Sequence, residues 1–287
     1  MSEDRTAPLT LATSRQHLRA DCQACTGLCC VAPALTRSAD FAIDKPAGRP
    51  CPHLQPGSAC GIHAELRPRG FAGCDVFDCF GAGQRAVAVS PDWRTGPQQA
   101  ETAFEVFAVL RQLHELLWHL AEAHARLATG ALRDEVDDAR ASVELLAGQA
   151  SDALLGTAVG AHRSQTGELL ARVSTTLRDR VSAGPGDRGD AGTRPDLSGG
   201  DLMGVDLRRT PLRGTSLRGA YLIGADLRDV DLHLTDLLGA DLRAADVRGA
   251  QLADALFLTR PQLQAAKGDA RTTLPAGLDR PRHWAAR

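Results

Sequence analysis

The chain has 287 residues, enough for two or three modest domains, and its apolar content of 43% is typical of a folded protein. Its formal net charge of −2 gives no overall attraction to nucleic acid or anionic membranes, and no stretch approaches the ~20 apolar residues of a membrane-spanning helix. We therefore expect neither nucleic acid nor a membrane as a partner. Residues 1–20 contain no apolar signal-peptide core, so they are interpreted as the flexible N-terminus of a cytoplasmic protein.

All eight cysteines lie within residues 21–96, in the spacing C-x2-C-x3-C-C, then C-x8-C, then C-x4-C. In a reducing cytosol, clustered cysteines more often bind metal or carry out redox chemistry than form disulfides. Tight spacing also lets short loops bring several thiolates to one ion. Residues 21–96 are therefore predicted to be a metal-binding module whose ligands for zinc or iron are Cys22, Cys25, Cys29, Cys30, Cys51, Cys60, Cys74 and Cys79.

The thiol count leaves the nuclearity of this centre open. Eight thiols suffice for two four-thiolate sites or for one polynuclear cluster, such as an iron–sulfur cluster. Adjacent Cys29 and Cys30 point in different directions on most backbones, so they could serve two sites, or only one of them could bind. His53 and His63 lie among the later cysteines and could replace a thiolate.

The stretch from Cys22 to Cys79 resembles a family of bacterial cysteine-rich proteins described as zinc- or iron-chelating. The matching segments are CQACTGLCC at 22–30, CPHL at 51–54, CGIH at 60–63 and Arg67-Pro68, followed by Cys74 and Cys79. The resemblance implies that these cysteines are ligands, and it leaves the identity of the metal open.

Residues 97–182 are predicted to form a helical bundle. Apolar residues recur at three- and four-residue spacing from Val106 to Leu127, Thr129-Gly130 interrupts the run, and two further amphipathic helices follow. The sequence HELLWH at 114–119 is not a zinc-protease motif, because histidines five apart lie ~140° apart on a helix. Glu115, His119 and Glu122 share a face, which we interpret as solvated.

Residues 183–195 are rich in Gly, Pro and Asp and are predicted to be a linker. In residues 196–258 an apolar residue recurs every five positions: ten leucines from Leu197 to Leu242, then Val247, Leu252 and Phe257. This period fits neither a helix nor a strand, whereas a coil that turns a corner every five residues would point every such residue inward. Asp often precedes the leucine, where it can accept backbone N–H bonds at the corner.

This pattern resembles the pentapeptide-repeat family, whose repeat reads A-(D/N)-L-x-x. The resemblance implies a right-handed quadrilateral β-helix with four pentapeptides per coil, capped here by residues 259–287. In that cap Thr259 precedes a short helix, and Trp284 covers the last coil. The expected fold class is thus multidomain α and β: a cysteine-rich metal module, a central α-helical region and a C-terminal pentapeptide β-helix.

The combination predicts a non-enzymatic metal-binding protein whose repeat segment is a scaffold for another protein. One alternative is an iron–sulfur redox or catalytic protein with an unknown substrate. A second is a DNA-mimicking protein that interacts with gyrase, as some members of the repeat family do, although the repeats hold ten Asp against seven Arg. The sequence has no Gly-rich phosphate loop and no Gly-x-Ser-x-Gly pattern, so we nominate no catalytic residue.

Overall fold

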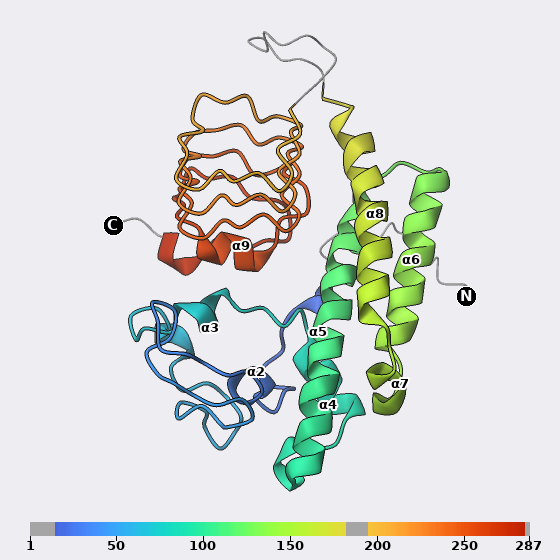
Figure 1. Cartoon of the computed structure of the whole chain (residues 1–287), viewed down its shortest axis with the longest axis vertical. Coiled ribbons are helices and arrows are strands. Elements are labelled where there is room, and N and C mark those ends of the chain that lie inside the picture. The colour runs from blue at the N-terminus through green and yellow to red at the C-terminus, as the bar shows by residue number, and fades with distance from the viewer. Residues whose placement is uncertain (1–14, 182–194, 285–287) are drawn as a thin grey trace, which may run out of the picture. The chain divides into compact units, whose positions relative to one another are not determined.

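The computed structural model describes residues 15–181 and 195–284, so most of the expected linker and residues 1–14 of the expected flexible N-terminus lie outside the described residues. The chain divides into two compact units, residues 1–170 and 171–287 (Figure 1). None of the helices described is both long enough and apolar enough to cross a membrane.

The cysteine-rich part of the first unit is mostly loops. Its short helices are η1 (Gln16–Leu18), α2 (Leu28–Val31), η2 (His63–Glu65), α3 (Ala72–Val76), α4 (Ala82–Val89) and η3 (Trp93–Thr95). Two isolated antiparallel bridges, Leu35↔Lys45 and Leu54↔Cys60, join its loops. One cluster of its buried residues contains Leu35, Ile62, Leu66 and Phe71. Other apolar side chains of this part, among them Leu28, Val31 and Phe80, are also buried.

The helical prediction for the middle of the chain is confirmed. The helices are α5 (Pro97–Arg126), α6 (Ala131–Ala147), α7 (Ser151–Leu155) and α8 (Val159–Arg178), and α5 packs against α6 and α7. The expected apolar face of α5 is buried, from Val106 to Leu120. The connection from α5 to α6 contains Gly130 at φ 144°. The third expected helix is split into α7 and α8, with Gly156 at the C-terminus of α7.

The expectation of a solvated face at Glu115, His119 and Glu122 is wrong for the last two residues. His119 is 6% exposed and Glu122 only 2% exposed. The Glu122 carboxylate accepts hydrogen bonds from Arg15 Nη2 at 3.0 Å and from Arg126 Nε at 2.9 Å. The Arg15 guanidinium also lies 3.9 Å from the centre of the Trp118 ring. Glu122 is buried because two arginines compensate its charge.

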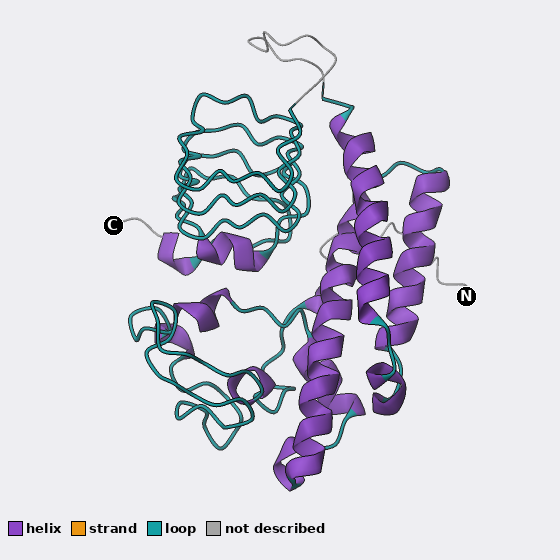
Figure 2. Cartoon of the chain, in the orientation of Figure 1, coloured by secondary structure: helices purple, strands orange, loops and turns teal. Residues whose placement is uncertain are grey.

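Residues 195–273 form a coil, here called the pentapeptide coil, in which isolated parallel bridges join residues twenty apart, as in Asp206↔Asp226 and Asp226↔Asp246. One turn of the coil therefore contains four pentapeptides. The expected β-helix is nevertheless contradicted, because no residue of 15–181 or 195–284 is in a β-strand (Figure 2). The pentapeptide coil is a succession of turns joined by single bridges.

Each five-residue repeat forms a turn. Few of its residues are left extended, which explains why no strand forms. All eight aspartates that precede the inward residue accept the backbone N–H two positions later, as Asp226 does from Arg228 at 3.2 Å; the others are Asp196, Asp201, Asp206, Asp231, Asp236, Asp241 and Asp246. The residue that follows the N–H donor often has a left-handed backbone, as at Gly204 with φ 68° and Ala244 with φ 57°. Too few consecutive residues remain extended for a continuous ladder.

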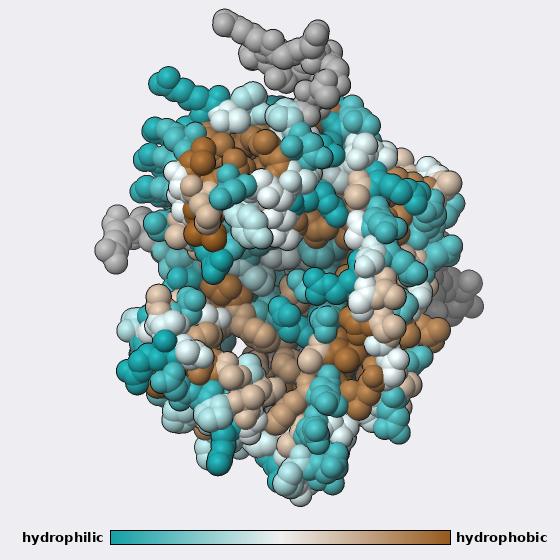
Figure 3. All heavy atoms as spheres, in the orientation of Figure 1, coloured by the Kyte–Doolittle hydropathy of each residue, from teal (hydrophilic) through white to brown (hydrophobic). Residues whose placement is uncertain are grey.

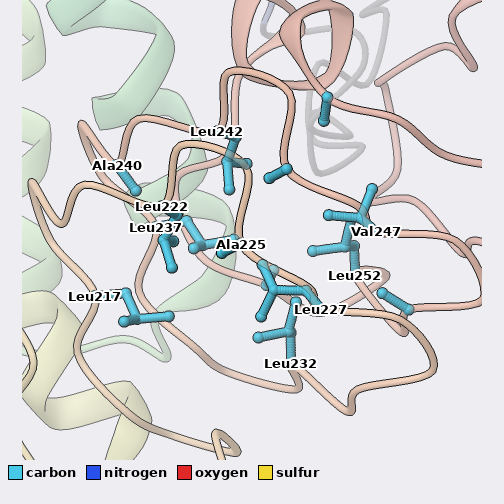
Figure 4. Close-up of a cluster of buried hydrophobic side chains, with 14 of the residues drawn as sticks. Leu217, Leu222, Ala225, Leu227, Leu232, Leu237, Ala240, Leu242, Val247 and Leu252 are labelled. Carbon is cyan, nitrogen blue, oxygen red and sulfur yellow. The ribbon is translucent and has the colours of Figure 1, made fainter. Parts of the chain in front are cut away.

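The inward register predicted for the apolar residues is confirmed. Leu217, Leu222, Leu227, Leu232 and Leu237 are 0% exposed and point into the interior of the pentapeptide coil (Figure 4). Small residues two positions earlier are also fully or almost fully buried: Thr215, Ala220, Ala225, Val230, Thr235, Ala240, Ala245, Ala250 and Ala255. Leucines and small, mostly apolar side chains thus fill the interior of the pentapeptide coil.

The C-terminal segment covers the last turn of the coil, with α9 (Arg260–Ala265) and η4 (Arg282–Trp284). Gln262 accepts the backbone N–H of Thr259 at 2.8 Å and donates to the carbonyls of Leu237 at 2.7 Å and Ala240 at 3.0 Å. Trp284 is 2% exposed and packs with the core of the coil, which confirms its predicted covering role. Lys267 and Thr273 bridge back to the coil although they lie outside the repeat pattern.

Candidate metal centre

The first four cysteines lie on a tight loop and on the short helix that follows it. The Asp21 carboxylate accepts the N–H groups of Gln23 at 3.0 Å and Ala24 at 3.3 Å, which fixes the loop carrying Cys22 and Cys25. Gly27 is left-handed at φ 75°, and a Cβ there would lie 2.7 Å from Leu54 Cδ1. Another residue at this position would be strained by the left-handed backbone and would displace the Leu54 side chain. Helix α2 then carries Cys29 and Cys30 as consecutive residues.

Backbone contacts bring three later cysteines toward Cys30. The N–H of Cys51 donates to the carbonyl of Cys30 at 3.0 Å. Cys60 forms an antiparallel bridge with Leu54, which lies three residues after Cys51. Cys74, on α3, and Cys60 both pack against the core of Leu35, Ile62, Leu66 and Phe71. Segments distant in sequence therefore present their thiols to one region.

Cys79 lies in a glycine-rich turn before α4. Its sulfur accepts hydrogen bonds from the N–H groups of Gly81 and Gly83. A Cβ on Gly83 would lie 2.8 Å from Cys25 Sγ and 3.9 Å from Cys79 Sγ, so both sulfurs border the same glycine. N–H groups directed at sulfur stabilise a thiolate and are common around metal-bound cysteines. The glycines therefore supply both the space and the hydrogen bonds.

His114 anchors the backbone next to Cys79. Its Nδ1 lies 2.8 Å from the carbonyl oxygen of Phe80, and the imidazole is 5% exposed. Burial lowers the pKa of His114 to about 4, partly offset by the bond to Phe80. The ring is therefore neutral at pH 7, and Nδ1–H is the donor to this carbonyl.

Several of the thiols lie close enough to one another to shift their pKa values. Burial raises the pKa of Cys22, and nearby Cys79 and Cys25 raise it further. Burial likewise raises the pKa of Cys74 to about 12, with further contributions from Cys30, Cys51 and Cys60. The pKa of Cys30 is lowered to about 7, chiefly because the Cys29 thiol donates to it, with a second hydrogen bond from Cys60. Like charges brought this close favour neutral thiols unless a cation is present.

A buried cation that our sequence analysis did not identify lies near Cys30, Cys51 and Cys74. Lys45 is 5% exposed, and its Nζ donates to four backbone carbonyls at 2.5–3.2 Å, those of Val31, Pro33, Pro46 and Arg49. Its ammonium interacts electrostatically with Cys51, Cys30 and Cys74. The chain has only two lysines, Lys45 and Lys267, so a lysine inside the cysteine module was an available signal.

All eight cysteines are free. In the arrangement shown, no three Cys, His, Asp or Glu side chains of the described residues converge closely enough to hold a metal ion. Rotation of a cysteine side chain between staggered χ1 wells would relocate its sulfur without moving the backbone. His53 packs edge-on against Phe71 at 5.2 Å between ring centroids, and His63 is exposed on η2. Metal ligation by the eight cysteines, or by either histidine, stays a prediction.

Comparison with known proteins addresses the C-terminal part directly. Residues 201–237 and 222–257 match the family model for pentapeptide repeats, with eight copies. Residues 201–257 are pentapeptide repeats. The chain is also similar to the uncharacterized protein YybG of Bacillus subtilis (strain 168), with 42% identity over 164 residues. This match covers 56% of the chain and 59% of YybG. This family model does not extend to the cysteine-rich segment, whose resemblance to zinc- or iron-chelating proteins rests on its motif.

Proposed function

We propose that the protein binds zinc or iron through its cysteine-rich module and uses the pentapeptide coil as a scaffold for another protein. The observation that carries the metal-binding proposal is that eight free thiols, from five separate segments, lie within one part of the chain that is built mostly of loops and short helices. A metal–thiolate centre would supply the cross-link that such a module needs, because binding free energy becomes folding free energy.

Two features of the surroundings support thiolates in particular. The N–H groups of Gly81 and Gly83 point at Cys79, and the N–H of Ile62 points at Cys60. The ammonium of Lys45 is buried near Cys30, Cys51 and Cys74, and the acceptors that it contacts among the described residues are backbone carbonyls. A buried ammonium is costly without a counter-charge. A metal–thiolate centre, which is anionic when four thiolates hold a divalent ion, would provide that charge.

The outer surface of the pentapeptide coil favours a protein partner over DNA mimicry. Asp206, Asp226 and Asp246 lie one turn apart on one face of the coil, here called a wall. Each forms a salt bridge with the arginine two residues later, with N–O distances of 2.5–2.6 Å. Arg208 also lies 3.3 Å from Asp226 of the next turn. Figure 3 shows hydrophilic side chains stacked down the outer edge of the coil. A DNA mimic needs unpaired carboxylates, whereas these charges are neutralised in pairs and present a mixed surface.

Metal analysis of the full chain, purified without oxygen, tests the proposal. We expect at least one equivalent of zinc or iron by mass spectrometry, with visible absorption only if the iron is in a cluster. Replacing Cys22 and Cys25 together by Ser should lower the content. The matched control replaces the two exposed residues between them, Gln23 and Ala24, by Ser and should keep the content unchanged. Less than about half an equivalent in the wild type, or a double cysteine variant with its full complement, refutes metal binding.

A further inference from the structure

We infer that the first turn of the pentapeptide coil is a docking surface for the first turn of a second copy of this chain. The two ends of the coil differ. The last turn is covered by α9 and by Trp284, whereas the first turn, residues 196–215, lies at the opposite end (Figure 1). This inference goes beyond the proposed function, because it concerns the end of the coil and does not depend on metal binding.

Apolar side chains of the first turn are exposed where their counterparts in later turns are buried. Val205 is 38% exposed, whereas Ala225 and Ala245 at the same repeat position are 0% exposed. Leu202 is only partly buried, whereas Leu222 is 0% exposed. The apolar interior of the coil therefore reaches solvent at this end. Covering it would remove apolar surface from water, which favours association.

The backbone of the first turn also presents an unpaired edge. In the second turn, the Tyr221 N–H donates to the Gly200 carbonyl at 2.9 Å, and the Tyr221 carbonyl accepts the Leu202 N–H at 2.9 Å. Asp201 is the equivalent residue at the start of the coil, and neither its N–H nor its carbonyl has a partner among the described residues. The same holds for Asp206. Such an edge is a template for pairing with another chain.

The shape of this edge favours a copy of the same chain over an extended peptide. The coil turns a corner every five residues, so a straight strand could follow only one wall. The first turn of a second copy has the same corners and can follow all four walls. It contains twenty residues, which reaches the ~20–30 residues that each partner contributes to a stable interface. Because the other end of the coil is covered, this pairing stops at a dimer.

A two-fold axis perpendicular to the coil, through the wall that carries Asp201, satisfies this edge. Two coils that meet in this way run antiparallel, so Asp201 and the partner's Asp201 can exchange reciprocal N–H···O=C bonds. Asp206 then faces the partner's Asp196. Pro211 occupies the same repeat position on the fourth wall and has no N–H. It faces its own copy, so no N–H or carbonyl that expects a donor is set against a proline from another wall.

Charge sets the strength of this contact. Asp206 forms a salt bridge with Arg208 at 2.6 Å, so the partner's Asp196 meets a neutralised carboxylate. The Asp201 carboxylate has no cationic partner among the described residues and accepts the N–H of Met203 at 3.2 Å. Like charges directly opposite one another destabilise an antiparallel pair. Added salt should therefore tighten the dimer, because it screens the repulsion between the two Asp201 carboxylates.

Sedimentation velocity of the full chain, under reducing and oxygen-free conditions, tests the inference. We expect a monomer–dimer equilibrium with a dissociation constant on the order of 10 μM. Asp201→Ala keeps the N–H and removes the charge, so it should tighten the dimer about threefold. Asp201→Pro also removes the N–H, in a repeat position that already accommodates Pro211, and should bind at least about fivefold more weakly than Asp201→Ala.

Two further variants locate the interface at the end of the coil. Val205→Asp places a charge on the apolar surface that the dimer covers, and it should abolish association. Tyr221→Ser is the matched control, because Tyr221 is 52% exposed but lies on the outside of the second turn. It should leave the dissociation constant unchanged within about twofold. A dimer that survives Val205→Asp, or that is lost in Tyr221→Ser, would overturn the inference.

Hydrogen exchange on the wild type gives a readout that no misfolded variant can obscure. Above the dissociation constant, the amides of Asp201 and Asp206 should exchange more slowly than below it. The amides of Leu202 and Leu207 already donate to the second turn at 2.9 Å and should change little. A dimer without slowed exchange at Asp201 and Asp206 refutes the proposed edge. A chain that stays monomeric at about 300 μM also refutes it, and dimerisation only after deletion of residues 1–14 would assign the edge to that segment instead.

Discussion

Removing one inward leucine from the middle of the pentapeptide coil should be far more destabilising than removing its counterpart from the first turn. Leu227 is 0% exposed, and its N–H donates to the Asp246 carbonyl at 2.8 Å. The preceding residue is bonded to the turn before, from the Asp226 N–H to the Val205 carbonyl at 2.9 Å. Hydrogen bonds to the preceding and the following turn therefore hold this part of the backbone. It cannot move inward to fill the cavity that a shorter side chain would leave. We expect Leu227→Ala to lower the free energy of unfolding by about 4 kcal/mol.

Two matched variants separate burial from position in the repeat. Leu202 occupies the same repeat position in the first turn but is only partly buried, so Leu202→Ala should cost less than about 2 kcal/mol. Arg228 follows Leu227 but lies outside, with its side chain 39% exposed and paired with Asp226. Arg228→Ala should therefore lower the free energy of unfolding far less than Leu227→Ala does.

Urea unfolding followed by Trp284 fluorescence measures these changes. The chain has three tryptophans, and replacing Trp93 and Trp118 by Phe leaves a reporter buried against the core of the coil. If Leu227→Ala lowers the free energy of unfolding by less than about 1 kcal/mol, or by no more than Leu202→Ala does, the inward register or the rigidity of the wall is misassigned.

Three further predictions concern other parts of the chain. Burial lowers the pKa of His114 from 6.5 in the free side chain to about 4 in the folded protein, so the unfolded chain binds a proton first as the pH falls. The free energy of unfolding should therefore be constant above pH 6.5, fall by about 2 kcal/mol between pH 6.5 and 5, and level off below pH 4. In His114→Gln this slope in urea unfolding, followed by Trp118 fluorescence, should disappear, and an unchanged slope would assign it to another group. Ala244→Gly should raise the Trp284 unfolding midpoint, by about 0.5–1 kcal/mol in stability, because Ala244 is held at φ 57°; a lower midpoint would show that glycine's entropy dominates. Gln262→Ala should cost about 2–3 kcal/mol in the same assay by leaving the Leu237 and Ala240 carbonyls without this donor, and a loss below about 0.5 kcal/mol would show that water replaces the amide.

The inward residues of the coil were predictable because every repeat places the same residue types in the same environment. The absence of strands was not, because the pattern reveals which side chains face inward but not how many backbone residues stay extended between turns. The continuation of the coil beyond residue 257 was also missed. Lys267 and Thr273 bridge Asp246 and Gln251 across 21 and 22 residues, so no five-residue pattern marks them.

The surroundings of the candidate metal centre could not be predicted from the sequence. Cysteine spacing nominates the thiols, but nothing in the sequence shows that four carbonyls would enclose Lys45, because that depends on where each peptide group points. The buried Glu122 shows the same limit. Its partner Arg15 is 107 residues away, so a local helical pattern cannot distinguish a paired carboxylate from a solvated one.

The twenty-residue turn gives length changes in residues 196–258 distinct geometric consequences. An inserted pentapeptide preserves the inward leucines but shifts everything after it by one wall, so that α9 caps the coil from a different side. Twenty inserted residues lengthen the coil and leave the cap in phase. One inserted residue would bring an aspartate into the aliphatic interior unless a bulge absorbed it, as occurs near the end, where bridge spacings grow to 21 and 22 residues. The length of the scaffold and the orientation of its faces are therefore set independently, by whole turns and by single repeats.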